Sequence, residues 1–177
     1  MPRTVAALGG TLLLGAALLA AGCAHTKAQR PGTGSLAFRV HWQGQADVDL
    51  SVSSPLGEHI DFGTKTAPSG GRLDVDCNYS SARRDDETAG APRSMPGMPE
   101  IERHVCAQPT ENIFWPRGEI PPGLYRVLLY IANPVPPPAA TDLYELQVIV
   151  RGDVKWRQSG RVADLATAHI DQVLEIR

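Results

Sequence analysis

From residue 35 onward, apolar and polar residues alternate along much of the chain. The first alternating segment spans residues 36–42 (LAFRVHW), and the second spans residues 47–53 (DVDLSVS). Successive side chains of a β-strand point to opposite faces, so a period of two is typical of strands that are buried on one face. Both segments are therefore predicted to be half-buried strands.

More strands are predicted between turn signals such as Pro55-Leu-Gly57 and Ser69-Gly-Gly71. A hairpin is expected around the turn Arg151-Gly-Asp153. The last segment, residues 169–177, fits a helix as well as a strand, and the strand is favoured. The other predicted strands cover residues 59–62, 73–77, 111–115, 125–131, 144–150 and 154–156.

Composition supports a turn-rich β protein. The chain has 15 prolines and 17 glycines in 177 residues, and it contains no long segment with a helical period. Short strands separated by turn signals predict an all-β fold, an antiparallel β-sandwich of immunoglobulin-like or jelly-roll-like type. The length suits one such domain, predicted to span residues 35–177.

The amino-terminal segment has the pattern of an export signal. One positive charge precedes an apolar stretch from Val5 to Ala21, which ends in Leu19-Ala-Ala-Gly-Cys23. This ending resembles the lipobox of bacterial lipoproteins, in which the cysteine is lipidated after cleavage. Residues 1–22 are therefore expected to be a cleaved signal peptide, with an ordinary signal peptide or an uncleaved anchor helix as alternatives.

The lipobox predicts where the protein resides. Cys23 would carry the acyl chains, palmitate among them, and become the first residue of the mature chain. Residues 23–34 have no apolar period and are expected to form a flexible tether. The anchor makes the membrane a partner, and Ala24 after the cysteine favours the outer membrane of an envelope with a periplasm, with either leaflet open.

The two remaining cysteines are predicted to form a disulfide. Cys77 and Cys106 are an even pair in an exported, oxidising setting. Between them lies a long polar loop, residues 78–104, whose ends the disulfide would join. Loops on a rigid sandwich commonly carry recognition, so this loop and the proline-rich segment near Pro136 are expected contact surfaces.

Two acidic pairs are candidates for a cation site. Asp47 and Asp49 alternate with apolar residues on one predicted strand, and Asp74 and Asp76 do so on another. Carboxylates that converge from two strands suit Ca²⁺, which takes six to eight oxygen ligands. The alternatives are solvated outer faces, ion pairs across a sheet, and capping of a turn.

Other function classes lack the motifs that they require. The net charge of -2 and an aromatic content of 6% argue against nucleic-acid binding. The sequence has no G-x-S-x-G nucleophile motif and no paired histidines at helical spacing for zinc. The chain is therefore expected not to be an enzyme and to need no cofactor, apart from the open question of Ca²⁺.

Several motifs, taken in order, resemble those of the YfaP-like family of bacterial exported proteins. They are ADVDLSV at 46–52, PLGEH at 55–59, GGRLDVDCN at 70–78, TENIFWP at 110–116 and PGLYRV at 122–127. The resemblance covers residues 38–150 and implies a β-sandwich without an established catalytic role. Ser51 departs from it, since the family often has histidine there.

These inferences predict a lipid-anchored, non-catalytic module of the cell envelope. Its expected role is to bind an envelope protein or a glycan, or to serve as an accessory to one. The alternative is a structural component of an envelope assembly that Ca²⁺ stabilises.

Overall fold

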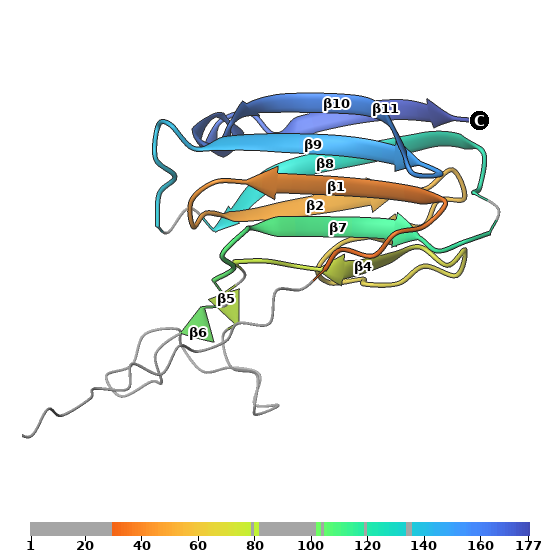
Figure 1. Cartoon of the computed structure of the whole chain (residues 1–177), viewed down its shortest axis with the longest axis horizontal. Coiled ribbons are helices and arrows are strands. Elements are labelled where there is room, and N and C mark those ends of the chain that lie inside the picture. The colour runs from red at the N-terminus through yellow and green to blue at the C-terminus, as the bar shows by residue number, and fades with distance from the viewer. Residues whose placement is uncertain (1–29, 79, 82–101, 104, 119, 134–135) are drawn as a thin grey trace, which may run out of the picture.

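The protein is a sandwich of two antiparallel sheets, as a computed structural model shows (Figure 1). The structure describes residues 30–78, 80–81, 102–103, 105–118, 120–133 and 136–177. The larger sheet has the strand order β10-β9-β1-β7-β4, and the smaller has the order β11-β8-β2-β3. The predicted all-β sandwich is confirmed.

The strands agree closely with the alternating segments of the sequence. The larger sheet contains β1 (Leu36–Trp42), β4 (Arg72–Val75), β7 (Thr110–Trp115), β9 (Leu143–Val150) and β10 (Asp153–Arg161). The smaller sheet contains β2 (Asp47–Ser53), β3 (His59–Ile60), β8 (Gly123–Asn133) and β11 (Ile170–Ile176). A separate ladder pairs β5 (Ser80–Ser81) with β6 (Glu102–Arg103).

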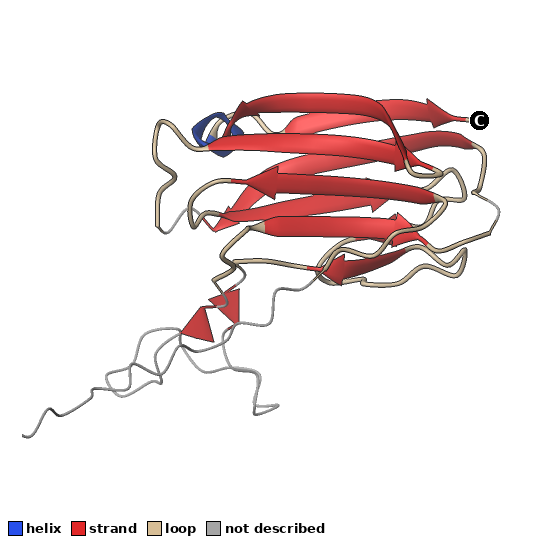
Figure 2. Cartoon of the chain, in the orientation of Figure 1, coloured by secondary structure: helices blue, strands red, loops and turns tan. Residues whose placement is uncertain are grey.

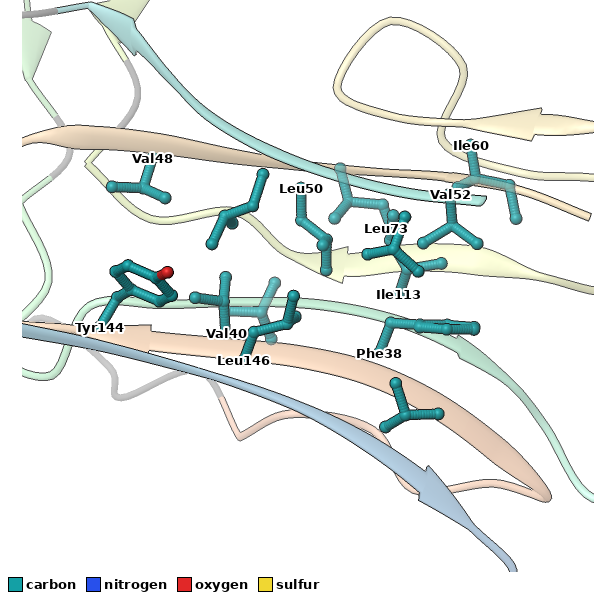
Figure 3. Packing of buried hydrophobic residues seen from close by; sticks show 14 of the residues in the cluster. Phe38, Val40, Val48, Leu50, Val52, Ile60, Leu73, Ile113, Tyr144 and Leu146 are labelled. Carbon is teal, nitrogen blue, oxygen red and sulfur yellow. The ribbon is translucent and has the colours of Figure 1, made fainter. Parts of the chain in front are cut away.

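The core fills the space between the two sheets. Phe38 and Val40 of β1 face Leu50 and Val52 of β2, and all four are fully buried (Figure 3). The polar residues between them point to the outer faces, as the period of two requires. Burial of apolar area at about 25 cal/mol per Å² is the main stabilising term for such a core.

An aromatic cluster joins the sheets at one end of this core. Trp115 of β7 packs edge to face against Phe38 and Tyr125, with ring centroids 6.1 Å and 5.4 Å away. The hydroxyl of Tyr125 donates a hydrogen bond of 2.8 Å to the carbonyl oxygen of Pro121, four residues upstream. This bond matches the tyrosine corner of immunoglobulin-like sandwiches, where it fixes the entry of the chain into a strand.

The carboxyl-terminal part contains one helical turn that the sequence pattern did not predict. The β9–β10 turn is confirmed, with positive φ at Arg151 and Gly152, as primed hairpin turns require. β10 then continues to Arg161 and is followed by the 3₁₀ helix η1 (Val162–Ala166), which is blue in Figure 2. The ambiguous last segment forms β11, so the strand interpretation is confirmed.

The expected tether is attached to the sandwich over its last residues. The amide of Gly32 donates to a carboxylate oxygen of Asp74 at 2.6 Å, and its carbonyl oxygen accepts from Arg39 and Asn112. The prediction that the whole of residues 23–34 is flexible is therefore wrong at Gly32, because polar side chains on the outer face of the larger sheet bind its backbone. Residues before 30 lie outside the described part of the chain.

The predicted disulfide is present. Cys77 and Cys106 are bonded, with their Cα atoms 5.7 Å apart. The bond lies beside the β5–β6 ladder and joins the two ends of the long loop, most of which, residues 82–101, lies outside the described residues. Across the described ranges, no helix is long and apolar enough to cross a membrane.

Replacing both cysteines, C77A with C106A, is expected to lower the free energy of unfolding by about 3–4 kcal/mol, because the open chain regains loop entropy when it unfolds. This corresponds to a fall in Tm of roughly 6–16 °C for a domain of this size. Thermal unfolding of the full-length chain measures it, with C23S as a control that retains the disulfide. A loss below about 1 kcal/mol would contradict the prediction.

Candidate functional site

One edge of β2 has only a short neighbouring strand. β8 pairs with β2 along its whole length, but β3 pairs on the other side only with Val52 and Ser53. The backbone of residues 47–51 on that side therefore needs other partners. Glu111 of β7 supplies one, because its Oε2 atom accepts a hydrogen bond from the amide of Leu50.

Glu111 lies among core residues. It shares the inward face of β7 with Ile113 and Trp115, and only 1% of it is exposed. Its second oxygen, Oε1, has no hydrogen-bond partner within the part of the chain that the structure describes. Burial, with Asp49 and Asp76 nearby, raises the pKa of the Glu111 carboxyl well above its usual range.

Asp49 and Asp47 are buried on the opposite side of β2 from its core residues. Their exposed fractions are 5% and 6%, so the predicted solvated face is wrong for this pair. Asp49 accepts a hydrogen bond from the hydroxyl of Tyr130, its neighbour across the ladder on β8. Burial, followed by the charges of Asp47 and Asp76, raises the pKa of Asp49 to about 7.

The predicted pair Asp74 and Asp76 is divided between two sites. The ladder of β4 with β7 shifts register between Leu73 and Val75, and the strand then ends. Asp74 lies on the outer face of the larger sheet, where Asn112 donates to it at 2.7 Å. Asp76 lies beyond the strand end, 3.2 Å from the ammonium group of Lys65 and close enough to Asp49 to affect its titration.

We refer to Asp47, Asp49, Asp76 and Glu111 as the edge carboxylates. Three come from the predicted acidic pairs, and Glu111 was not predicted. Asp74, the remaining member of those pairs, instead accepts hydrogen bonds from Asn112 and from the amide of Gly32. In the described parts of the chain, no group of three or more His, Cys, Asp or Glu side chains is arranged to hold a metal ion. The edge carboxylates nevertheless influence one another electrostatically beside the open edge of β2, and two of them, Asp49 and Glu111, have raised pKa values.

A serine–histidine–aspartate grouping lies on the same outer face. The Nδ1 atom of His59 is 3.1 Å from the hydroxyl of Ser53, and Nε2 is 3.2 Å from Oδ2 of Asp61. Nucleophilic catalysis also requires hydrogen-bond donors for a developing oxyanion. Since Nε2 is shared with Ser51 at 3.3 Å, the contacts orient the imidazole ring but assign no residue as a nucleophile.

A recess of about 500 Å³ opens where β1 ends and β7 begins. These two strand termini lie at the same end of the sandwich (Figure 1). One wall is the turn between β1 and β2, and the other is the segment that leads from the disulfide into β7. Its volume falls in the usual range for ligand sites. The lining residues are His41, Trp42, Gln43, Gly44, Cys106, Ala107, Gln108 and Pro109.

Asn78 holds the two walls of the recess together. Its side-chain amide donates to the carbonyl oxygen of Ala46 at 3.2 Å, and its side-chain oxygen accepts from the amide of Cys106 at 3.0 Å. Asn78 has a positive φ of 64°, a conformation that asparagine tolerates better than most residues. These bonds and the adjacent disulfide make the recess a fixed feature of the fold.

Sequence reasoning missed both Glu111 and the recess. Glu111 does leave a signal in TENIFW, because it has the same parity as Ile113 and Trp115 and so occupies a core position. The recess left no signal in the sequence. Its two walls are loop segments far apart in the chain, and long-range contacts bring them together. Of the two expected contact surfaces, most of the long loop, residues 82–101, lies outside the described residues. In the proline-rich segment near Pro136 only residues 134–135 lie outside them, and no contact with a partner is tested at either surface.

Comparison with known proteins yields no match to a family model, to a curated protein or to a solved structure. The resemblance to the YfaP-like family therefore stays a prediction from the sequence motifs. The function proposed for the chain therefore rests on its own residues.

The raised pKa of Asp49 predicts that stability falls with increasing pH. The folded chain retains a proton on Asp49 up to about pH 7, whereas the unfolded chain releases it near the ordinary aspartate pKa of 3.8. Between these values the folded state binds more protons, so the free energy of unfolding decreases as pH rises. Each pKa unit is equivalent to about 1.4 kcal/mol, and Glu111 acts in the same direction.

Denaturation of the full-length chain in chelator between pH 4 and pH 8 measures this effect. The difference in unfolding free energy between D49N and wild type should grow in favour of D49N as pH rises, because asparagine carries no charge and still accepts from Tyr130. D153N, which changes an exposed carboxylate, is the matched control. A difference between D49N and wild type that does not vary with pH would contradict the assigned pKa.

Proposed function

We propose that the protein is a lipid-anchored module of the cell envelope that binds an envelope protein or a glycan and performs no catalysis. The observation that carries this proposal is the recess at the end of the sandwich. Its walls are fixed by the Cys77–Cys106 disulfide and by the bonds of Asn78, so little ordering cost opposes binding there.

The lining of the recess suits a polar ligand. His41, Gln43 and Gln108 bring groups that can donate and accept hydrogen bonds, and Pro109 and Trp42 add apolar lining. Burial and the nearby Arg39 lower the pKa of His41, so its imidazole is neutral near pH 7. A neutral imidazole and two amides favour hydroxyl and amide groups, which glycans and peptides both carry.

The lipobox supports the anchored location. The distance between the lipid and the sandwich is limited because the end of the tether is bound to the larger sheet. Because Gly32 is bound to the larger sheet, only the residues from Cys23 to Gly32 separate the lipid from the sandwich. A fully extended chain of this length spans at most roughly 30 Å. The recess would therefore work close to the membrane, within reach of partners that lie at its surface.

Site-specific photo-crosslinking in intact envelopes tests the binding role. A photo-reactive amino acid in place of Gln108 should give one major crosslinked product, because this position lines the recess. The same amino acid in place of Lys155 is the matched control, since Lys155 is exposed on β10 near the opposite end of β1. Mass spectrometry of the product identifies it as a protein or a glycan.

Two outcomes would count against the proposal. Equal crosslinking from both positions, or none from position 108, would show that the recess does not bind a partner. The C23S variant tests the anchor separately, because it should move the chain from the membrane fraction to the soluble fraction. Membrane association that survives C23S would overturn the lipid anchor without bearing on the recess.

A further inference from the structure

We propose that the sandwich rests on the membrane by the side that carries β3 and β4, with the exposed ring of Phe62 among the lipid headgroups. The turn that presents this ring, residues 61–64, is called the Phe62 turn below. The proposal rests on the lipid anchor proposed above and goes beyond it, because it assigns a second membrane contact and an orientation. It does not depend on the recess.

The fold holds the large apolar side chain of Phe62 in solvent, where it is 56% exposed. The Oδ1 atom of Asp61 accepts from the amides of Gly63 and Thr64, at 2.8 Å and 2.7 Å, and these bonds fix the turn. Leu56, which is 64% exposed, precedes β3 as Phe62 follows it, so both turns that flank β3 present an apolar side chain. Single exposed apolar residues are common, and a partner has to be argued from their surroundings.

The tether reaches the sandwich at the same side as the Phe62 turn. The amide of Gly32 donates to Asp74 at 2.6 Å, and the carbonyl oxygen of Lys65, directly after the turn, accepts from the amide of Leu73 at 2.9 Å. Both segments are therefore attached to consecutive residues of β4, the edge strand of the larger sheet. Figure 1 shows the described end of the tether, in orange, beside β4, with β10 and β11 at the opposite side.

The length of the tether decides which side lies nearest to the lipid. Gly32 fits closely in place, since a Cβ atom there would lie 2.5 Å from the ring of Phe114. From Cys23 to Arg30, the first described residue, the extended chain spans at most roughly 25 Å. At about 4.8 Å per strand, β10 lies roughly 19 Å beyond β4 across the five-stranded sheet. Turning the β10 side to the membrane would therefore leave the tether almost fully extended, at a cost in conformational entropy.

The charges on this side suit a surface of lipid phosphates. Lys65, Arg72 and Arg30 are exposed there. The neighbouring carboxylates are occupied, because Asp61 binds the amides of its own turn and Asp76 lies 3.2 Å from the ammonium group of Lys65. The Lys65 side chain is 56% exposed and that of Asp76 only 13%, so the cation is the outer member of the pair. An aromatic ring beside exposed cations is typical of segments that lie at a membrane interface.

Tryptophan fluorescence of the lipidated full-length chain tests the contact, in vesicles of phosphatidylethanolamine and phosphatidylglycerol with and without brominated acyl chains. F62W places a tryptophan on the turn, and V173W is the matched control, because Val173 is 59% exposed on β11 at the other edge of the smaller sheet. After subtraction of the wild-type emission, the signal of F62W should shift to shorter wavelength and be quenched by the brominated lipid. The signal of V173W should show neither effect.

Flotation of the vesicles separates failure of this contact from failure of the anchor. If the chain floats with the vesicles and F62W is not quenched, or if F62W and V173W are quenched equally, the membrane contact of Phe62 is overturned and the anchor stands. If the chain does not float, the lipid anchor and this contact both fail. Quenching of F62W alone in the floating fraction supports the proposed orientation.

Discussion

The hydrogen bond from the Leu50 amide to the Glu111 carboxylate is the contact on which the arrangement of this edge depends. β3 is too short to cover β2, and a strand edge with unsatisfied amides is both costly and prone to pair with other chains. A side chain from the opposite sheet closes this gap. The closure places an acidic group inside the sandwich, where burial raises the pKa of Glu111 well above its usual range.

The carboxylate edge and the recess are linked through the turn between β1 and β2. Asp47 directly follows Ala46, whose carbonyl oxygen accepts from Asn78 and from the indole of Trp42. One wall of the recess is thus continuous with the strand that carries the edge carboxylates.

Local sequence patterns predicted the features that depend only on nearby residues. Alternation located β1 and β2, and the compartment implied by the lipobox led to the disulfide. The pattern failed where pairing between distant segments decides the outcome. The register shift in β4 separates Asp74 from Asp76, and the shortness of β3 makes Glu111 necessary; neither is encoded within a few residues of the affected position.

Amide hydrogen exchange at Leu50, followed by NMR, tests the central claim most directly. If Glu111 closes the edge of β2, the Leu50 amide exchanges slowly in the wild type and much faster in E111A, while the amide of Leu129 in the middle of β8 stays protected in both. Equal protection of the Leu50 amide in wild type and E111A would contradict the account, because another group would then close the edge.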